Sequence, residues 1–171
     1  MNESQYVNDE KEYLRNKYIA FLKFMKKLKL KNYKIINVRD VNKDRHRIVF
    51  TDRGNFYLLY KKDYYNSFST KYADFIYKVP AMRGVGDSIN VDFLNLAIQK
   101  KVNFLVFIHE TETFIVDPQD MKEYCEKNHL KDLQDKNNKY RGNEGRGYNI
   151  HELTYRIPKS WLDLYNLEGE I

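Results

Sequence analysis

The chain has 171 residues, of which 42% are hydrophobic and 32% charged, and a formal net charge of +6. This length suits one domain with a real core, and the composition excludes both a disordered tail and a membrane protein. The longest apolar stretch, Phe104 to Ile108, is far too short to span a bilayer, and the single cysteine excludes an intramolecular disulfide and a zinc–thiolate cluster. The polar first residues lack the apolar stretch of a signal peptide, so we expect a soluble cytoplasmic protein.

The positive charge is concentrated near the N-terminus. Residues 11–34 contain nine Lys or Arg residues and one acid, Glu12, whereas the rest of the chain is close to balanced. A net positive charge favours an anionic partner. This distribution favours nucleic acid as that partner.

An amphipathic helix is predicted from about Asp9 to Leu30. Its apolar residues recur at steps of three and four, which is the spacing of one helix face: Leu14, Tyr18, Phe21, Leu22, Met25 and Leu28. Its lysines fall largely off that stripe: Lys17, Lys23, Lys26, Lys27 and Lys29. These lysines either form a solvated face whose stems cover apolar surface, or contact phosphates.

Three strands are predicted next, at Tyr33–Val38, Arg47–Thr51 and Phe56–Tyr60. The turn before the third strand contains Gly54, which is free to adopt a positive φ. The third strand has no polar alternation, as expected of a central strand covered on both faces. We expect the three strands to form an antiparallel meander.

The segment Lys61–Val79 is dense in aromatic and basic residues. Such residues suit base stacking with phosphate contacts, or they pack on the edge of a core. The glycines of Arg83–Ser88 precede a helix predicted from about Asn90 to Lys101. This loop either binds a phosphate at the helix N-terminus or is a simple turn, because it lacks the P-loop and dinucleotide fingerprints.

The C-terminal part is predicted to begin with a hairpin. Its elements are, in chain order, strands at Phe104–Ile108 and Phe114–Val116, a helix capped by Asp117 and ending near Asn128, a mobile basic loop at Lys131–Asn149, a strand at Glu152–Ile157 and a helical turn at Trp161–Tyr165. Cys125 lies within a helical pattern and is interpreted as a small core residue.

The order of these elements resembles the PD-(D/E)XK, or restriction-endonuclease-like, nuclease superfamily, with the archaeal Holliday-junction resolvases closest in layout. The resemblance covers about Asp9 to Val116 and rests on a helix, a meander ending in lysine, a helix and a strand. It implies a single α/β domain over residues 1–171, with a mixed central β-sheet flanked by helices. It also implies a nucleic-acid-binding protein with a nuclease-like core that acts as a metal-dependent DNA endonuclease.

The resemblance assigns three catalytic residues. Glu12 matches the glutamate of the first helix, and Asp44 is the acid nearest to the start of the second strand. Lys61 matches the lysine at the end of the third strand, which assists the attacking water in that family.

The resemblance also implies a site for Mg²⁺ or Mn²⁺. The family places an acid two residues before the lysine, but Leu59 stands there and cannot bind a metal. Asp63, two residues beyond the lysine, and Asp92, on the following helix, are the candidate replacements. Either would act with Asp44, since Mg²⁺ takes oxygen ligands and keeps several waters. The alternative interpretation is that each of these acids is an ordinary surface carboxylate without a metal.

Nucleic acid, with DNA favoured over RNA, is the expected partner. We expect five basic residues to contact its phosphates: Lys23, Lys26, Lys27, Lys62 and Arg83. No membrane is expected. Resolvase-like cores commonly act as twofold dimers, so we expect a homodimer, with Tyr64–Tyr77 and Phe104–Val116 as candidate interface segments.

Three alternatives remain open. The chain is a binding module that has lost the nuclease chemistry, as Leu59 suggests, or a protein-interaction or structural protein whose basic helix is only soluble surface. Metal-free RNA cleavage by His, Tyr and Lys, as in the tRNA-splicing endonucleases, would use His46 or His151. No motif anchors this last reading.

Overall fold

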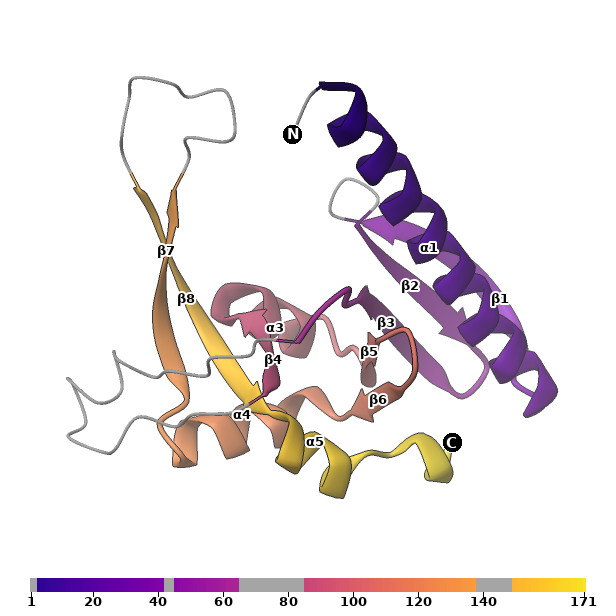
Figure 1. Ribbon diagram of the computed structural model, residues 1–171. Helices are drawn as coiled ribbons and strands as arrows, with labels where there is room; N and C mark the ends of the chain where they lie inside the picture. The colour runs from indigo at the N-terminus through magenta and orange to yellow at the C-terminus, as the bar shows by residue number, and fades with distance from the viewer. Residues whose placement is uncertain (1–2, 42–44, 65–84, 138–148) are drawn as a thin grey trace. The chain divides into compact units, whose positions relative to one another are not determined.

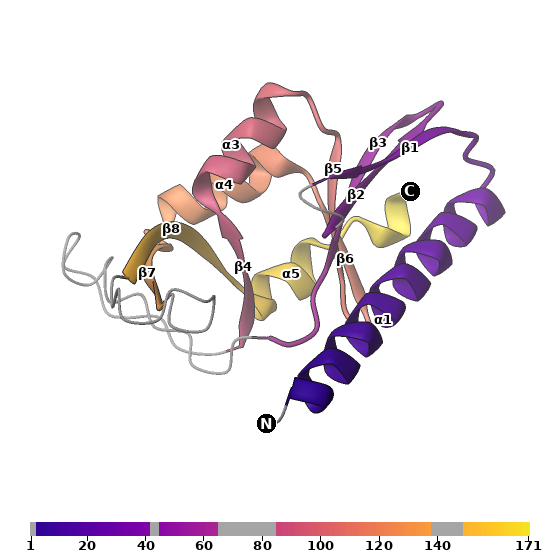
Figure 2. The ribbon, with the colours of Figure 1, turned by 90° about the horizontal axis from the view of Figure 1, so that it is seen from above.

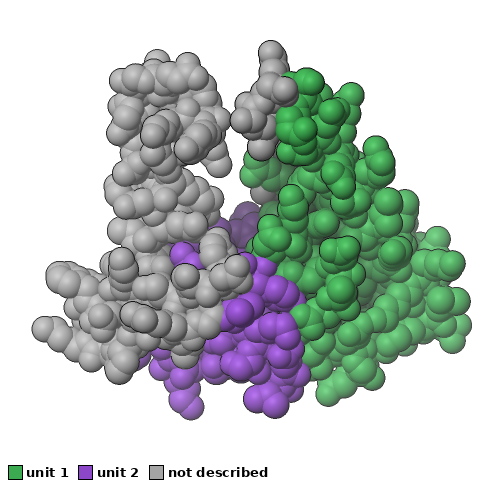
Figure 3. Space-filling model, viewed as in Figure 1, with its two compact units in different colours: residues 1–63, 102–116, 166–171 green, residues 64–101, 117–165 purple. Residues whose placement is uncertain are grey.

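The structure is a computed structural model that describes residues 3–41, 45–64, 85–137 and 149–171. The chain is mixed α/β and contains a five-stranded and a three-stranded sheet. It divides into two compact units, which are coloured separately in Figure 3. Unit 1 comprises residues 1–63, 102–116 and 166–171, and unit 2 comprises residues 64–101 and 117–165. The expectation of one domain stays a prediction.

The sheet of unit 1 has the strand order β1-β2-β3-β5-β6. β1 (Ile35–Val41), β2 (His46–Thr51) and β3 (Gly54–Tyr60) form the antiparallel meander that the sequence predicted. β5 (Phe104–Ile108) runs parallel to β3 and pairs with β6 (Thr113–Val116) in the predicted hairpin. The predicted mixed sheet is therefore present, and β3 is its middle strand.

Helix α1 (Glu3–Leu30) runs along one face of this sheet (Figures 1 and 2). Phe21, Phe24 and Leu28 are buried in a core cluster with residues of β2, β3, β5 and β6. The Phe24 and Phe56 rings lie 5.8 Å apart. This apolar contact fixes which side of the helix faces the sheet.

The buried stripe of α1 differs from the predicted one. Leu14 and Leu22 are 38% and 58% exposed, whereas Lys17, which was expected off the stripe, is fully buried. Lys17 precedes Phe21, Phe24 and Leu28 at helical spacing, so these four residues form the face toward the sheet. A pattern that counts only apolar residues misses this face, because the long methylene stem of a lysine also packs against rings.

The C-terminal segment of the chain belongs to unit 1. The Leu167 amide donates to the Ile115 carbonyl at 2.9 Å, and the Asn166 side chain bonds the Ile115 amide and the Thr113 carbonyl, each at 2.9 Å. These bonds occupy the outer edge of β6, which would otherwise be open to another strand. The short 3₁₀ helix η2 (Glu168–Glu170) follows.

Unit 2 contains a second sheet that the sequence did not predict. Its antiparallel order is β4-β8-β7, with β4 at Gly86–Asn90, β7 at Lys131–Asn137 and β8 at Asn149–Pro158. β4 replaces part of the turn expected at Arg83–Ser88, and β7 replaces the start of the loop expected from Lys131. Neither segment has a clear strand pattern in its own sequence. Each forms a strand because it pairs with β8.

The helices of unit 2 are α3 (Val91–Gln99), α4 (Pro118–Lys127) and α5 (Lys159–Tyr165). The predicted cap of α4 is confirmed, because Asp117 Oδ1 accepts from the Asp120 amide at 3.0 Å and Pro118 follows. α3 and α4 lie side by side (Figure 2). Cys125 is fully buried, as interpreted, and burial raises the pKa of its thiol.

Within the described residues, no helix has the length and apolar character needed to cross a membrane.

Candidate functional site

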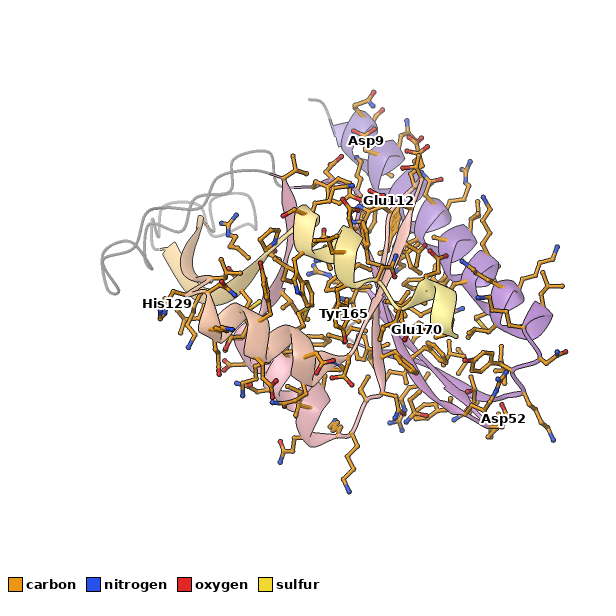
Figure 4. The ribbon with its side chains drawn as sticks, turned by 90° about the horizontal axis from the view of Figure 1, so that it is seen from below. Asp9, Asp52, Glu112, His129, Tyr165 and Glu170 are labelled. Carbon is orange, nitrogen blue, oxygen red and sulfur yellow. The ribbon has the colours of Figure 1, made fainter. Side chains whose placement is uncertain are left out.

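Unit 1 has an open groove of about 850 Å³ beside α1. One wall is the stretch of α1 from Glu12 to Lys27, which is about 22 Å long at the rise of an α-helix. The other wall is formed by the end of β3, the turn between β5 and β6, and η2. Glu112, which belongs to that turn, is labelled in Figure 4. Apolar side chains of Ile19, Phe24 and Ile108 also line the groove.

Charges of both signs line this groove. The cations are Lys23, Lys27 and Lys62, and the acids are Glu12, Glu110, Glu112 and Glu168. Lys27 forms an ion pair with Glu168, and burial followed by the nearby Lys31 lowers the pKa of Lys27. Lys31 Nζ in turn donates to the Glu168 carbonyl at 3.2 Å. Lys27 therefore links α1 to η2 through its ion pair with Glu168.

An aromatic residue marks the end of the groove nearest to the start of α1. The Tyr60 ring lies 5.4 Å from the Tyr13 ring, at an interplanar angle of 47°. The pKa of Tyr60 is raised, first by burial and then by Tyr13, Glu110 and Asp63. This end of the groove therefore holds an aromatic hydroxyl with Glu12, Glu110 and Lys62.

A second polar cluster lies where β2 begins and β3 ends. His46 is the cross-strand partner of Leu59, and its Nδ1 is 3.0 Å from the Tyr57 hydroxyl. The pKa of His46 is lowered to about 4, first by burial and then by Lys61, Arg45 and Lys17. His46 is accordingly neutral at pH 7. The charged residues that lower its pKa are all cations.

Lys61 extends the β3 ladder by one residue, since its amide donates to the Ile108 carbonyl at 2.8 Å. It lies two residues beyond Leu59, so strand alternation places it on the face that carries His46 and Tyr57. Its ammonium is 5.7 Å from the centre of the Phe107 ring. The structure thus brings together a His, a Tyr and a Lys that the sequence pattern did not connect.

Arg47 is held in place by structural contacts. Its Nε donates to Asp40 Oδ1 at 2.7 Å, and its guanidinium lies 5.6 Å from the ring centres of both Tyr18 and Phe21. This residue ties β1 and β2 to α1.

The structure brings four of the predicted site residues into one groove: Glu12, Lys23, Lys27 and Lys62. Lys61 directly precedes Lys62 but does not itself line the groove. Lys26 is exposed on α1 and does not line it either.

The predicted metal ligands are distributed differently. Asp63 is exposed just after β3 in unit 1, and Asp92 is exposed in the first turn of α3 in unit 2. Asp44, Arg83 and the side chain of His151 lie outside what the structure describes.

The carboxylates of the described residues do not assemble a metal centre. Among the residues that the structure describes, no group of three or more His, Cys, Asp or Glu could hold a metal ion. Leu59, where the family carries an acid, is 3% exposed. The expected Mg²⁺ site stays a prediction, because its shared ligand Asp44 lies outside the described residues.

One candidate dimer segment, Phe104–Val116, packs within the protomer itself. The apolar side chains of β5 and β6 from Leu105 to Ile108 and from Phe114 to Val116 are buried within the chain. The other segment, Tyr64–Tyr77, lies almost entirely outside the described residues. The homodimer stays a prediction.

Several residues of these two clusters were missed by sequence reasoning. Tyr57, Tyr60 and Glu110 carried no motif, and Lys17 was expected off the apolar stripe of its helix. The residue that the sequence did single out was His46, and its partner became visible only through the pairing of β2 with β3.

Comparisons of this chain with protein-family models, curated proteins and solved structures found no match.

Proposed function

We propose that this protein binds nucleic acid through unit 1, with DNA as the preferred partner. The observation that carries the proposal is the exposed basic surface of α1. Its exposed cations are Lys11, Arg15, Lys23, Lys26 and Lys29. Glu12 is the one acid between Lys11 and the end of the helix at Leu30.

A row of cations on a straight helix suits a phosphate backbone. The rise of an α-helix places Lys11 and Lys29 about 27 Å apart, and a DNA duplex presents a phosphate charge about every 1.7 Å of its axis. Several lysine–phosphate contacts can therefore form together, each releasing counterions. The core cluster that anchors α1 to the sheet keeps this row rigid.

The strand order supports a nuclease-like core as part of the same proposal. A helix precedes an antiparallel meander, and the next strand of the sheet, β5, returns parallel to β3. A parallel return needs a long crossover connection, which the nuclease-like layout also has. We therefore include a restriction-endonuclease-like fold for this chain in the proposal.

Binding can be tested by fluorescence anisotropy with a labelled DNA duplex. We expect affinity to fall by roughly 40-fold between about 50 and 200 mM salt if three lysine–phosphate contacts form. Reversing two exposed charges of α1, with Lys26→Glu and Lys29→Glu together, should weaken binding strongly. The control pair Lys100→Glu and Lys127→Glu makes the same charge change on exposed lysines of unit 2. Binding that is insensitive to salt, or equal losses in both pairs, would contradict the proposal.

Metal-dependent cleavage of DNA is a second candidate, favoured by the position of Glu12. This acid lines the groove of α1 together with Lys62, which directly follows the assigned Lys61 in sequence. Asp44 with Asp63 or Asp92 would hold Mg²⁺, which would supply Lewis-acid activation of the attacking water. The chain itself would contribute the ammonium of Lys61 to stabilise developing negative charge.

Cleavage is tested by incubating the protein with single-stranded, duplex and four-way DNA, with and without Mg²⁺ or Mn²⁺. We expect Lys61→Ala and Asp44→Ala each to abolish cutting, while duplex binding survives. Metal-dependent cutting that is unchanged in Asp44→Ala would refute the assigned ligand. Binding without cutting on every substrate would assign the chain to the class of binding modules.

A further inference from the structure

The groove beside α1 is poorly suited to a continuous duplex backbone. Lys27 is engaged by Glu168, which leaves Lys23 and Lys62 against Glu12, Glu110 and Glu112. A phosphate chain laid along the whole groove would meet these three carboxylates and be repelled by them. A duplex bound to exposed lysines outside the groove, such as Lys26, would avoid these carboxylates.

The charges of the groove are instead separated along its length. Lys23 lies toward the C-terminal half of α1, whereas Glu12 lies about 16 Å earlier along the helix axis. The early end also holds Tyr60, whose hydroxyl is under the influence of Glu110 and Asp63. The end at Lys23 is therefore basic, and the other end combines an aromatic ring and carboxylates with Lys62, which follows Tyr60 by two residues.

We propose that this groove holds a short unpaired stretch of nucleic acid, with a phosphate at Lys23 and a base on Tyr60 beside Glu12 and Glu110. This proposal rests on the proposed function and names its substrate class. The aromatic ring provides a stacking face, which every base can use. Carboxylates accept hydrogen bonds from exocyclic amino groups, as Glu and Asp do from cytosine N4.

The size and the floor of the groove agree with such a ligand. A volume of about 850 Å³ is in the range of small-ligand sites, which combine apolar walls with a few convergent polar groups. Ile19, Phe24 and Ile108 supply the apolar lining. Tyr60 is itself anchored, because it packs against the core and against the Tyr13 ring. A fixed ring loses little freedom when a base stacks on it.

The test uses the full chain and labelled DNA strands of about eight nucleotides, a length within the site sizes of single-strand binders. We expect Tyr60→Leu and Lys23→Glu each to weaken binding of oligo-deoxycytidine by about tenfold. Lys100→Glu is the matched control, because Lys100 is an exposed lysine of unit 2 that lies neither in the groove nor on α1. Oligo-deoxythymidine, which lacks an exocyclic amino group, should bind more weakly than oligo-deoxycytidine, and Glu110→Gln should reduce that difference.

The outcomes separate the two proposals. Circular dichroism is used to check that Tyr60→Leu folds, and Lys23→Glu, at an exposed position, tests the groove independently of that variant. Single-strand binding that survives both changes but falls in Lys26→Glu would overturn the groove and leave nucleic-acid binding intact. No binding of any DNA, single-stranded or duplex, would overturn both.

Discussion

At the scale of single residues, His46 shows how position controls chemistry. An exposed histidine titrates near pH 6.5, but in the folded chain burial and the cations Lys61, Arg45 and Lys17 lower the pKa of His46 to about 4. The neutral ring meets the Tyr57 hydroxyl at 3.0 Å. His46 is therefore a group that the fold keeps uncharged.

This shift makes stability depend on pH. Below about pH 6.5 the unfolded chain binds a proton at His46, whereas the folded chain does so only below about pH 4. The contribution of His46 is thus complete above pH 6.5 and is lost as the pH falls toward 4, by roughly 3 kcal/mol at most. Urea unfolding should show a smaller loss of stability over this range in His46→Gln, whose side chain does not titrate. An unchanged pH dependence in that variant would contradict the assignment.

At the scale of elements, the turn between β2 and β3 depends on a glycine. Gly54 has a φ of +131°, and a Cβ built there would lie 3.1 Å from Asn103 Oδ1. That oxygen already accepts from the Asn55 amide at 2.9 Å. The turn is closed further by Thr51 Oγ1, which donates to the Gly54 carbonyl at 2.7 Å.

We expect Gly54→Ala to destabilise the chain by roughly 1–3 kcal/mol, because alanine rarely adopts this φ and its methyl group displaces Asn103. Chemical denaturation measures the change. Gly169→Ala is the matched control, since a Cβ there meets no atom within 4 Å, and it should change stability by less than about 0.5 kcal/mol. Equal effects of the two substitutions would show that the turn does not require glycine.

At the scale of the whole molecule, charge and topology are distributed unevenly. The basic helix, the five-stranded sheet and the groove all belong to unit 1, whereas unit 2 is built on the antiparallel sheet of β4, β8 and β7. The proposed contacts with nucleic acid therefore use one unit. The net charge of +6 adds a long-range attraction that salt weakens, and the salt dependence of duplex binding tests it.

Local sequence signals predicted the elements that local forces form. The cap at Asp117 followed by Pro118, the apolar run Phe104–Ile108 and the turn before Gly54 were read correctly from neighbours a few residues apart. The meander followed because short turns join antiparallel neighbours. The burial of Cys125 followed from its place in a helical pattern.

Only the tertiary structure decided which side chains meet. Lys17 is buried because the sheet selects the face of α1 that packs best, and β7 is a strand because β8 lies beside it. His46 reaches Tyr57 through cross-strand register, and Glu12 shares a groove with Glu110 across about one hundred intervening residues. Each of these contacts depends on how far-apart segments pack, and that free energy has no signature in a short window of sequence.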